Sequence, residues 1–301
     1  MIAGLKKQWQ ILKGMAEAGK LPHALLFAGP EKIGKKTLAI ETAKFIFCQE
    51  GEPGDRPCQK CRACSDVASR SHPDLSLVLA QEGAIKIAQI RDFGWRLSLK
   101  PYSAKIKVGI IDDIHLAESD AQNSLLKTLE EPKGDTLLIL VTHSPQMLLK
   151  TVFSRVQVLK FPLVSQKEIE DHLISLGADR LKAGEIADLS LGRPGQAIDF
   201  LNDPEKVKIQ EQEIKDIGLM LKSGIPERFG YVKKITDSPE TVIGILDLWE
   251  RELRRLLLQH PEGRPGLVRG IKALEDTVCL IKTTNANQRL ALENLMLNLN
   301  I

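Results

Sequence analysis

Short apolar runs alternate with stretches of helical periodicity through the first half of the chain. Most are rich in leucine, isoleucine and valine and bounded by turn residues, as buried strands are. The runs are ALLFA (24–28), LSLVLA (75–80), KVGIID (107–112), TLLILVT (136–142) and VQVLKF (156–161). Five strands that alternate with helices predict an α/β fold with a doubly wound parallel sheet.

The strand pattern stops at about residue 162, and only helical patterns follow it. Three short helical stretches separated by glycines run to about residue 204, where Asn202, Asp203 and Pro204 indicate a boundary. Residues 205–301 have helical periodicity, with breaks at 224–226, 238–239 and 260–265. The chain is therefore predicted to form an α/β core over 1–162, a small helical lid over 163–204 and an all-α domain over 205–301.

The loop after the first strand has the spacing of a phosphate-binding P-loop. Gly29 and Gly34 stand five positions apart, Lys35 follows, and a helical pattern begins there. Glycines let backbone N–H groups turn toward phosphate, and the lysine reaches the β- and γ-phosphates. Lys36 stands where the motif has its Mg²⁺-binding hydroxyl, and Thr37 follows one residue later. Nucleotide binding is still expected, but Mg²⁺-dependent hydrolysis is in doubt because an ammonium cannot coordinate a cation. The alternative is an ordinary glycine-rich turn.

Polar residues at the ends of two other strands complete the candidate nucleotide site. Asp112 and Asp113 end the third apolar run, and Thr142 ends the fourth. The first carboxylate of such a pair holds Mg²⁺, and a glutamate in second place polarises the attacking water. Asp113 is one methylene shorter than glutamate, so it is expected to be a poor base. The alternative is a solvated acidic turn.

The cysteines indicate a metal site. Cys48, Cys58, Cys61 and Cys64 have the spacing C-x9-C-x2-C-x2-C, and Cys279 stands alone in an apolar stretch, where a core position is expected. Four thiolates suit tetrahedral Zn²⁺, and a closed Cys₄ shell leaves no open position for catalysis. A structural zinc knuckle is predicted, and four unrelated surface thiols are the alternative.

Composition limits the remaining function classes. The chain has 301 residues and a net charge of +3, too slight to indicate nucleic acid by itself, and aromatic residues make up 4%. No apolar run of about 18 residues occurs, so no membrane span is expected and the protein should be soluble and cytoplasmic. Trp95, on the predicted helix over 86–99, is expected to pack in the core.

Together these motifs resemble the bacterial clamp-loader branch of the AAA+ proteins, over essentially the whole chain. The resemblance rests on LPHALLFAGP, GKKTLA, the four-cysteine insertion after the first P-loop helix, IIDDIHLAESDAQNSLLKTLEEP, the Ser154-Arg155 pair before the fifth strand, and NANQRLALENLMLNL near the end. It implies an AAA+ P-loop core with a zinc module at 48–64, a helical lid and an oligomerisation collar, with ATP or ADP and Mg²⁺ bound weakly.

Three departures favour the branch's rigid stator over its ATP-hydrolysing subunit: Lys36, Asp113, and a chain that ends after the collar. The resemblance also implies that Arg155 is an arginine finger acting in trans, although valine replaces the cysteine of the S-R-C motif; an arginine capping a helix is the alternative. By the same resemblance, Arg193 lies near the position at which active relatives carry a sensor arginine in the lid.

The implied partners are gamma/tau and delta subunits in a heteropentamer, the sliding clamp, and primed DNA through the assembly, with no membrane. Two other functions stay open on the sequence. One is a gamma/tau-like clamp-loader ATPase that hydrolyses ATP itself. The other is a zinc-knuckle nucleic-acid-binding protein with a vestigial P-loop.

Overall fold

The computed structural model describes residues 3–50, 55–132, 134–237, 239–259, 264–284 and 286–299. They form two compact units, Met1–Leu201 and Asn202–Ile301. The first unit contains a parallel sheet flanked by helices, and helices make up the second, which confirms the predicted fold class. The predicted domain boundaries at 162 and 204 stay a prediction. Residues 51–54 of the predicted knuckle and the predicted breaks at 238 and 260–263 lie outside the described residues.

The sheet has five strands in the order β2-β3-β4-β1-β5, and all neighbours are parallel. The strands are β1 (Ala24–Ala28), β2 (Leu75–Val78), β3 (Lys107–Ile111), β4 (Thr136–Thr142) and β5 (Gln157–Lys160). In parallel strands the carboxyl ends share one edge, and Ala28 pairs with Thr142 there. The loop after β1, the acidic pair after β3 and the end of β4 therefore meet at one edge.

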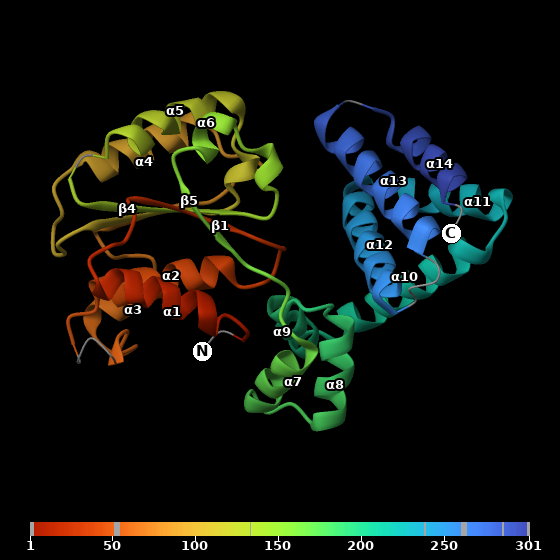
Figure 1. The fold of residues 1–301 in the computed structure, drawn as a ribbon, viewed down its shortest axis with the longest axis horizontal. Helices are drawn as coiled ribbons and strands as arrows, with labels where there is room; N and C mark the ends of the chain where they lie inside the picture. Colours follow the sequence, from red (N-terminus) through yellow and green to blue (C-terminus); the bar gives the residue numbers. More distant parts are fainter. Residues whose placement is uncertain are drawn as a thin grey trace. The chain divides into compact units, whose positions relative to one another are not determined.

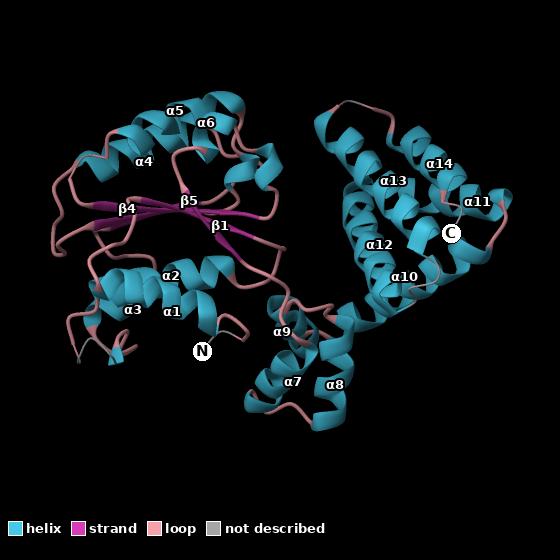
Figure 2. Ribbon diagram, viewed as in Figure 1, coloured by secondary structure: helices cyan, strands magenta, loops and turns pink. Residues whose placement is uncertain are grey.

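Helices cover both faces of this sheet (Figure 1). One face carries α1 (Lys6–Glu17), α2 (Lys35–Phe47) and α3 (Arg62–Ala68), and the other carries α4 (Ile87–Ser98), α5 (Ser119–Glu130) and α6 (Lys150–Phe153) (Figure 2). Because both faces are covered, every residue of β1 and β3 is buried. This burial explains why these strands read as apolar runs rather than as alternating patterns.

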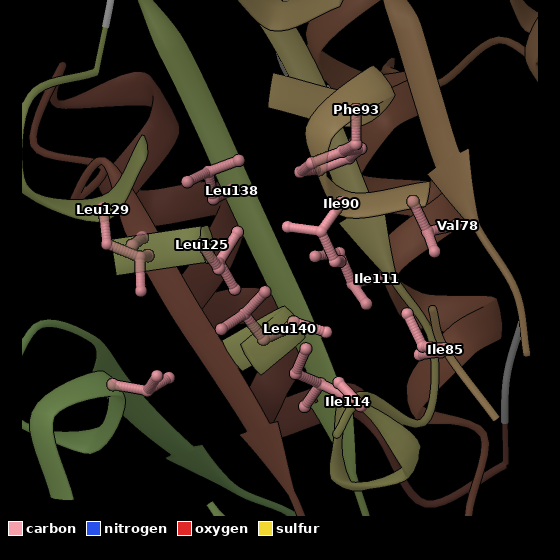
Figure 3. Packing of buried hydrophobic residues seen from close by; sticks show 14 of the residues in the cluster. Val78, Ile85, Ile90, Phe93, Ile111, Ile114, Leu125, Leu129, Leu138 and Leu140 are labelled. Atoms are coloured by element: carbon pink, nitrogen blue, oxygen red, sulfur yellow. The ribbon is translucent and has the colours of Figure 1, made fainter. Parts of the chain in front are cut away.

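The core between the sheet and α4 and α5 is built from aliphatic side chains and one phenylalanine (Figure 3). Ile90 of α4 lies beside Ile111 of β3 and Phe93 of α4 packs over Gly109, while Leu125 of α5 faces Leu138 of β4. Burying each such side chain stabilises the fold by about 1.5–3 kcal/mol. This packing holds the strand ends that carry the candidate site.

Three further helices complete the first unit, and the rest form the second. The first unit ends with α7 (Gln166–Ser175), α8 (Arg180–Leu189) and α9 (Pro194–Asn202). The second consists of α10 (Pro204–Lys222), α11 (Ile225–Thr236), α12 (Pro239–Gln259), α13 (Arg264–Thr283) and α14 (Gln288–Asn298). Two short 3₁₀ turns, η2 (Ile114–Leu116) and η3 (Pro145–Met147), follow β3 and β4. Among the helices described, none is long and apolar enough to span a bilayer.

Two expectations about buried residues are wrong. Trp95 is 60% exposed, because α4 turns Phe93 and Leu97 inward and a residue two positions after Phe93 points away from the sheet. Cys279 is exposed, because it lies outside the buried face of α13, which includes Leu267 and Leu274. Neither residue supports the core.

Candidate functional site

The loop between β1 and α2 has the conformation that a P-loop requires. Gly34 has φ +100° and immediately precedes α2, so a side chain there would be strained. At Gly29 a Cβ atom would lie 2.3 Å from the carbonyl oxygen of Phe161, so only glycine fits. The structure thus places both predicted glycines where the backbone turns from strand to helix.

Lys35, the predicted phosphate ligand, is folded back onto its own loop. Its Nζ donates hydrogen bonds to the carbonyl oxygens of Gly29, at 2.7 Å, and Pro30, at 2.6 Å. Burial lowers the pKa of Lys35 to about 8, against the opposing charges of Asp113 and Glu31. These two carbonyl oxygens hold the ammonium against the loop that the motif predicts will bind phosphate.

The ammonium of Lys36 lies beside Asp112, the predicted Mg²⁺ ligand. Its Nζ lies 2.8 Å from Oδ2 of Asp112, which is mostly buried at the end of β3. Thr37, the displaced hydroxyl residue, lies one position further into α2 and lines the adjacent cavity. A cation supplied by the chain itself thus neutralises the carboxylate that a metal ion would otherwise engage.

Asp113 faces two histidines. It has a left-handed φ of +50°, and its Oδ1 lies 3.6 Å from Nδ1 of His143 and 3.9 Å from Nδ1 of His115. The pKa of Asp113 is lowered, first by the His143 imidazole and then by the charges of His115 and Lys35, although burial opposes the shift. A carboxylate stabilised in its ionised form is a weaker base. The sequence interpretation missed His115; its position two residues after Asp113 was the available signal.

Thr142 is completely buried, and its hydroxyl is engaged within the protein. The oxygen accepts a hydrogen bond from the backbone N–H of Ser144 at 3.0 Å and lies 3.2 Å from Nδ1 of His115. The predicted nucleotide contact of Thr142 stays a prediction, and here the hydroxyl orients His115.

A cavity of about 800 Å³ lies beside the P-loop. Its lining includes Gly34 and Thr37 of the P-loop and α2, Leu5 and Trp9 of the N-terminal segment, and Pro194 of α9. Its size lies within the range of small-molecule sites, and its apolar walls suit a nucleotide base. The predicted phosphate-binding turn therefore borders a cavity large enough for the rest of a nucleotide.

Helix α9, which lies in the segment predicted as a lid, is hydrogen-bonded to the P-loop. The backbone N–H of Gly195 donates to the carbonyl oxygen of Lys32 at 2.8 Å, and the Lys32 ammonium pairs with Asp199 at 2.6 Å. A Cβ at Gly195 would lie 2.7 Å from the same carbonyl oxygen, so glycine permits this approach. Arg193, at the start of this segment, lies close enough for its charge to lower the pKa of Lys35.

The structure brings the four predicted metal ligands together. The sulfur atoms of Cys48, Cys58, Cys61 and Cys64 all lie within 4.8 Å of one another, and those of Cys48 and Cys61 are 4.0 Å apart. Tetrahedral Zn²⁺ with Zn–S bonds of about 2.3 Å needs sulfurs about 3.8 Å apart. The four residues therefore fit a zinc ion.

Backbone donors around the cysteines favour thiolates. The N–H of Cys61 donates to the sulfur of Cys58 at 3.3 Å, and the N–H of Cys64 donates to the sulfur of Cys61 at 3.4 Å. Hydrogen bonds from backbone N–H groups, with that of Lys60 first, lower the pKa of Cys58 to about 7, whereas burial raises the pKa of Cys64. A metal ion would supply the charge compensation that buried Cys64 lacks.

Arg155 lies at the amino-terminal ends of the strands, whereas the P-loop lies at their carboxyl ends. It precedes β5, where Gln157 pairs with Leu25, whereas Gly29 follows the far end of β1. At about 3.3 Å per residue the two edges are roughly 15–20 Å apart. The guanidinium pairs with Glu130 and donates to the carbonyl oxygen of Thr151 at 2.8 Å. Arg155 is therefore remote from its own nucleotide site, and its Thr151 contact keeps the helix-capping alternative open.

Comparison with known proteins gives one family. A profile described as "DNA polymerase III, delta subunit" matches residues 4–165. The delta' subunit of DNA polymerase III from Bacillus subtilis is 36% identical over 206 residues, which is 68% of this chain and 62% of the relative. The tau subunit from the same organism is 36% identical over 152 residues, which is 50% of this chain and 26% of the relative. The chain thus spans less than two thirds of the length of these relatives.

A solved structure of a DNA polymerase III gamma subunit-related protein from Thermotoga maritima is also similar. It covers 97% of this chain and 98% of its own, at 17% identity and a TM-score of 0.46.

Proposed function

Because this chain belongs to the DNA polymerase III delta subunit family, we propose that it is a delta-prime-type stator of a bacterial clamp loader. In this role it helps to load the sliding clamp onto primed DNA and does not hydrolyse ATP itself. Similarity to both delta' and tau proteins supports the clamp-loader part of the proposal. Gamma/tau and delta subunits are the proposed partners in a heteropentamer.

The contact between Lys36 and Asp112 is the observation that carries the assignment to a stator. At 2.8 Å the two side chains form an ion pair where hydrolysing P-loop proteins hold Mg²⁺ between a hydroxyl and a carboxylate. An ammonium cannot coordinate a metal ion. Without that ion the charge that develops on a transferring phosphoryl group is not neutralised, so nucleotide can bind while hydrolysis fails.

Asp113 supports the same conclusion, because it is the residue expected to activate the attacking water. A general base must accept a proton, yet the neighbouring imidazoles of His115 and His143 and the Lys35 ammonium lower the pKa of this carboxyl. Its side chain is also too short to reach as far as the usual glutamate. Metal placement and water activation are therefore both impaired.

Arg155 is proposed to act on a neighbouring subunit's nucleotide. It lies at the sheet edge away from its own P-loop, and its side chain is about one third exposed. A guanidinium presented to a γ-phosphate in trans accelerates hydrolysis by about 10³–10⁵ where this has been measured. The cysteine cluster has a structural role in this proposal, with Zn²⁺ holding the segment after α2.

The test is ATP hydrolysis by the purified chain and by the reconstituted loader. The chain alone should turn over ATP far below the roughly 1 s⁻¹ of slow ordinary enzymes. Arg155→Ala should assemble normally but reduce the DNA-stimulated ATPase rate and clamp loading of the complex. Ordinary turnover by the isolated chain would instead favour the gamma/tau-like ATPase.

Glu130→Gln is the matched control for Arg155. It breaks the ion pair of Arg155 but leaves the guanidinium in place. If Arg155 is a finger, Glu130→Gln should keep near-normal loading while Arg155→Ala loses it. Equal effects of the two variants on the complex would indicate that Arg155 acts only through local structure, and the stator assignment would lose that support.

A further inference from the structure

A second group of metal-ligating side chains lies at the carboxyl edge of the sheet, apart from the four cysteines. Asp113 follows β3, His115 lies in η2, and His143 follows β4. The ligand atoms of these three residues all lie within 4.8 Å of one another. The two imidazole rings meet edge to face with centroids 4.0 Å apart. The parallel sheet therefore brings together three ligands from two separate loops.

The distances within this group suit a transition-metal ion. Oδ1 of Asp113 lies 3.6 Å from Nδ1 of His143 and 3.9 Å from Nδ1 of His115. Nitrogen and oxygen ligands at about 2.0–2.2 Å from a tetrahedral ion lie about 3.3–3.6 Å apart. Side-chain shifts of a few tenths of an ångström would therefore close the group around one ion.

His143 supplies an independent indication of a missing ligand. Its Nδ1 is buried and has no hydrogen-bond partner among the described residues, and the nearby Asp113 oxygen at 3.6 Å is beyond hydrogen-bond length. Buried polar atoms normally have a partner, so an orphaned one calls for an explanation. An ion between Nδ1 and the carboxylate would satisfy both atoms.

We propose that Asp113, His115 and His143 bind a divalent first-row transition metal, such as Zn²⁺, Co²⁺ or Ni²⁺, at a site separate from the cysteine cluster. Two imidazoles and one carboxylate with open positions are a recurrent donor set for such ions, whereas Mg²⁺ prefers oxygen ligands alone. The hard-cation position at Asp112 is already occupied by Lys36. This inference does not depend on the clamp-loader proposal.

Two neighbours limit the affinity of this site. The Lys35 ammonium acts on Asp113 and repels a dication, although the carbonyl oxygens of Gly29 and Pro30 hold that ammonium on the P-loop. Thr142 lies 3.2 Å from Nδ1 of His115 and would give up that contact, while keeping the one from Ser144 N–H. The site should therefore bind metal more weakly than the four thiolates do.

Cobalt titration of the full chain tests the proposal. The cysteine site is first filled with one equivalent of Zn²⁺, and Co²⁺ is then added. We expect one further equivalent to bind, with weak visible bands and without sulfur-to-cobalt charge transfer. Paramagnetically shifted proton signals from two imidazoles should appear in the same sample. An excess of Mg²⁺ should not displace this cobalt.

Variants separate this site from general metal binding. His143→Ala and Asp113→Asn should each weaken the second cobalt at least tenfold while the cysteine site keeps its zinc, whose retention reports on folding. His172→Ala, which removes a half-buried histidine from α7, is the matched control and should bind cobalt as the unmodified chain does. The proposal is overturned if the zinc-loaded chain takes up no second cobalt, if no imidazole signals shift, or if His143→Ala binds it unchanged.

Discussion

Replacing Lys36 by threonine restores the hydroxyl that a P-loop normally presents to Mg²⁺. In the present chain its ammonium lies 2.8 Å from Asp112, with 35% of the lysine side chain and 14% of the aspartate side chain exposed. A partly exposed pair of this kind contributes about 1 kcal/mol after allowance for solvent screening. Its loss should lower the melting temperature of the first unit by about 2–4 °C in the absence of metal.

Added Mg²⁺ and ATP should reverse the sign of this effect. The Lys36→Thr protein has a hydroxyl and an uncompensated Asp112 carboxylate, so Mg²⁺ can bind between them together with the phosphates. A ligand at about 100 times its dissociation constant stabilises the folded state by about 2.7 kcal/mol, which exceeds the loss of the ion pair. Thermal unfolding in EDTA, in Mg²⁺ alone and in Mg²⁺ with ATP measures each contribution separately.

Lys36→Met is the matched control, because it removes the charge without supplying a hydroxyl. It should show the same loss in EDTA as Lys36→Thr and a smaller gain with Mg²⁺ and ATP. If the two variants respond equally to Mg²⁺ and ATP, the hydroxyl is irrelevant and Lys36 does not replace a metal ion. If neither variant is less stable in EDTA, the ion pair contributes nothing to the fold.

Two further predictions concern the cysteines and Lys35. Metal analysis of the purified chain should find one equivalent of Zn²⁺. The Cys61→Ser variant should lose this zinc, whereas the control Cys279→Ser, at an exposed position, should retain it. Equal zinc retention by the two variants would refute the zinc site. Nucleotide affinity should fall as the pH rises through about 8, where Lys35 loses its charge, and Lys35→Met should abolish this dependence in a binding titration. The unfolded chain holds this proton up to about pH 10.5, so stability should rise from about pH 8 to that value as the cost of burying the ammonium disappears.

The sheet and the phosphate-binding turn were predictable because their signals are local. Strands β1 and β4 are buried on both faces, so burial alone makes their sequences apolar runs. Gly34 must be glycine because its φ is +100°, and that requirement is readable from the spacing of the motif. Cysteine spacing likewise predicted a cluster, because the two C-x2-C turns that share Cys61 can present three sulfurs to one ion that Cys48 also reaches.

The histidine group was not predictable, because it depends on strand order. His115 and His143 are far apart in the sequence, and they meet because β4 lies beside β3 in the sheet. The position of His115 two residues after Asp113 is a local signal, but it does not show that the two imidazole rings meet. Trp95 was misjudged for a different reason: aromatic residues are usually buried, but the helical stripe of α4 passes it by.

In the candidate nucleotide site the two lysine ammonium groups have partners within the chain, and this property fits the proposed stator. Lys35 bonds carbonyl oxygens, Lys36 pairs with Asp112, and Asp113 lies against imidazoles.

Helix α9, in the predicted lid, also contacts the P-loop: the Gly195 N–H donates to the carbonyl oxygen of Lys32, and the Lys32 ammonium pairs with Asp199. A nucleotide can shift a conformational equilibrium only by as much as it binds one state better than the other. Because internal contacts already hold α9 on the P-loop and neutralise Asp112, we expect that difference to be small. Under the stator proposal, Arg155 would then keep the same surroundings whether or not the cavity beside the P-loop is filled.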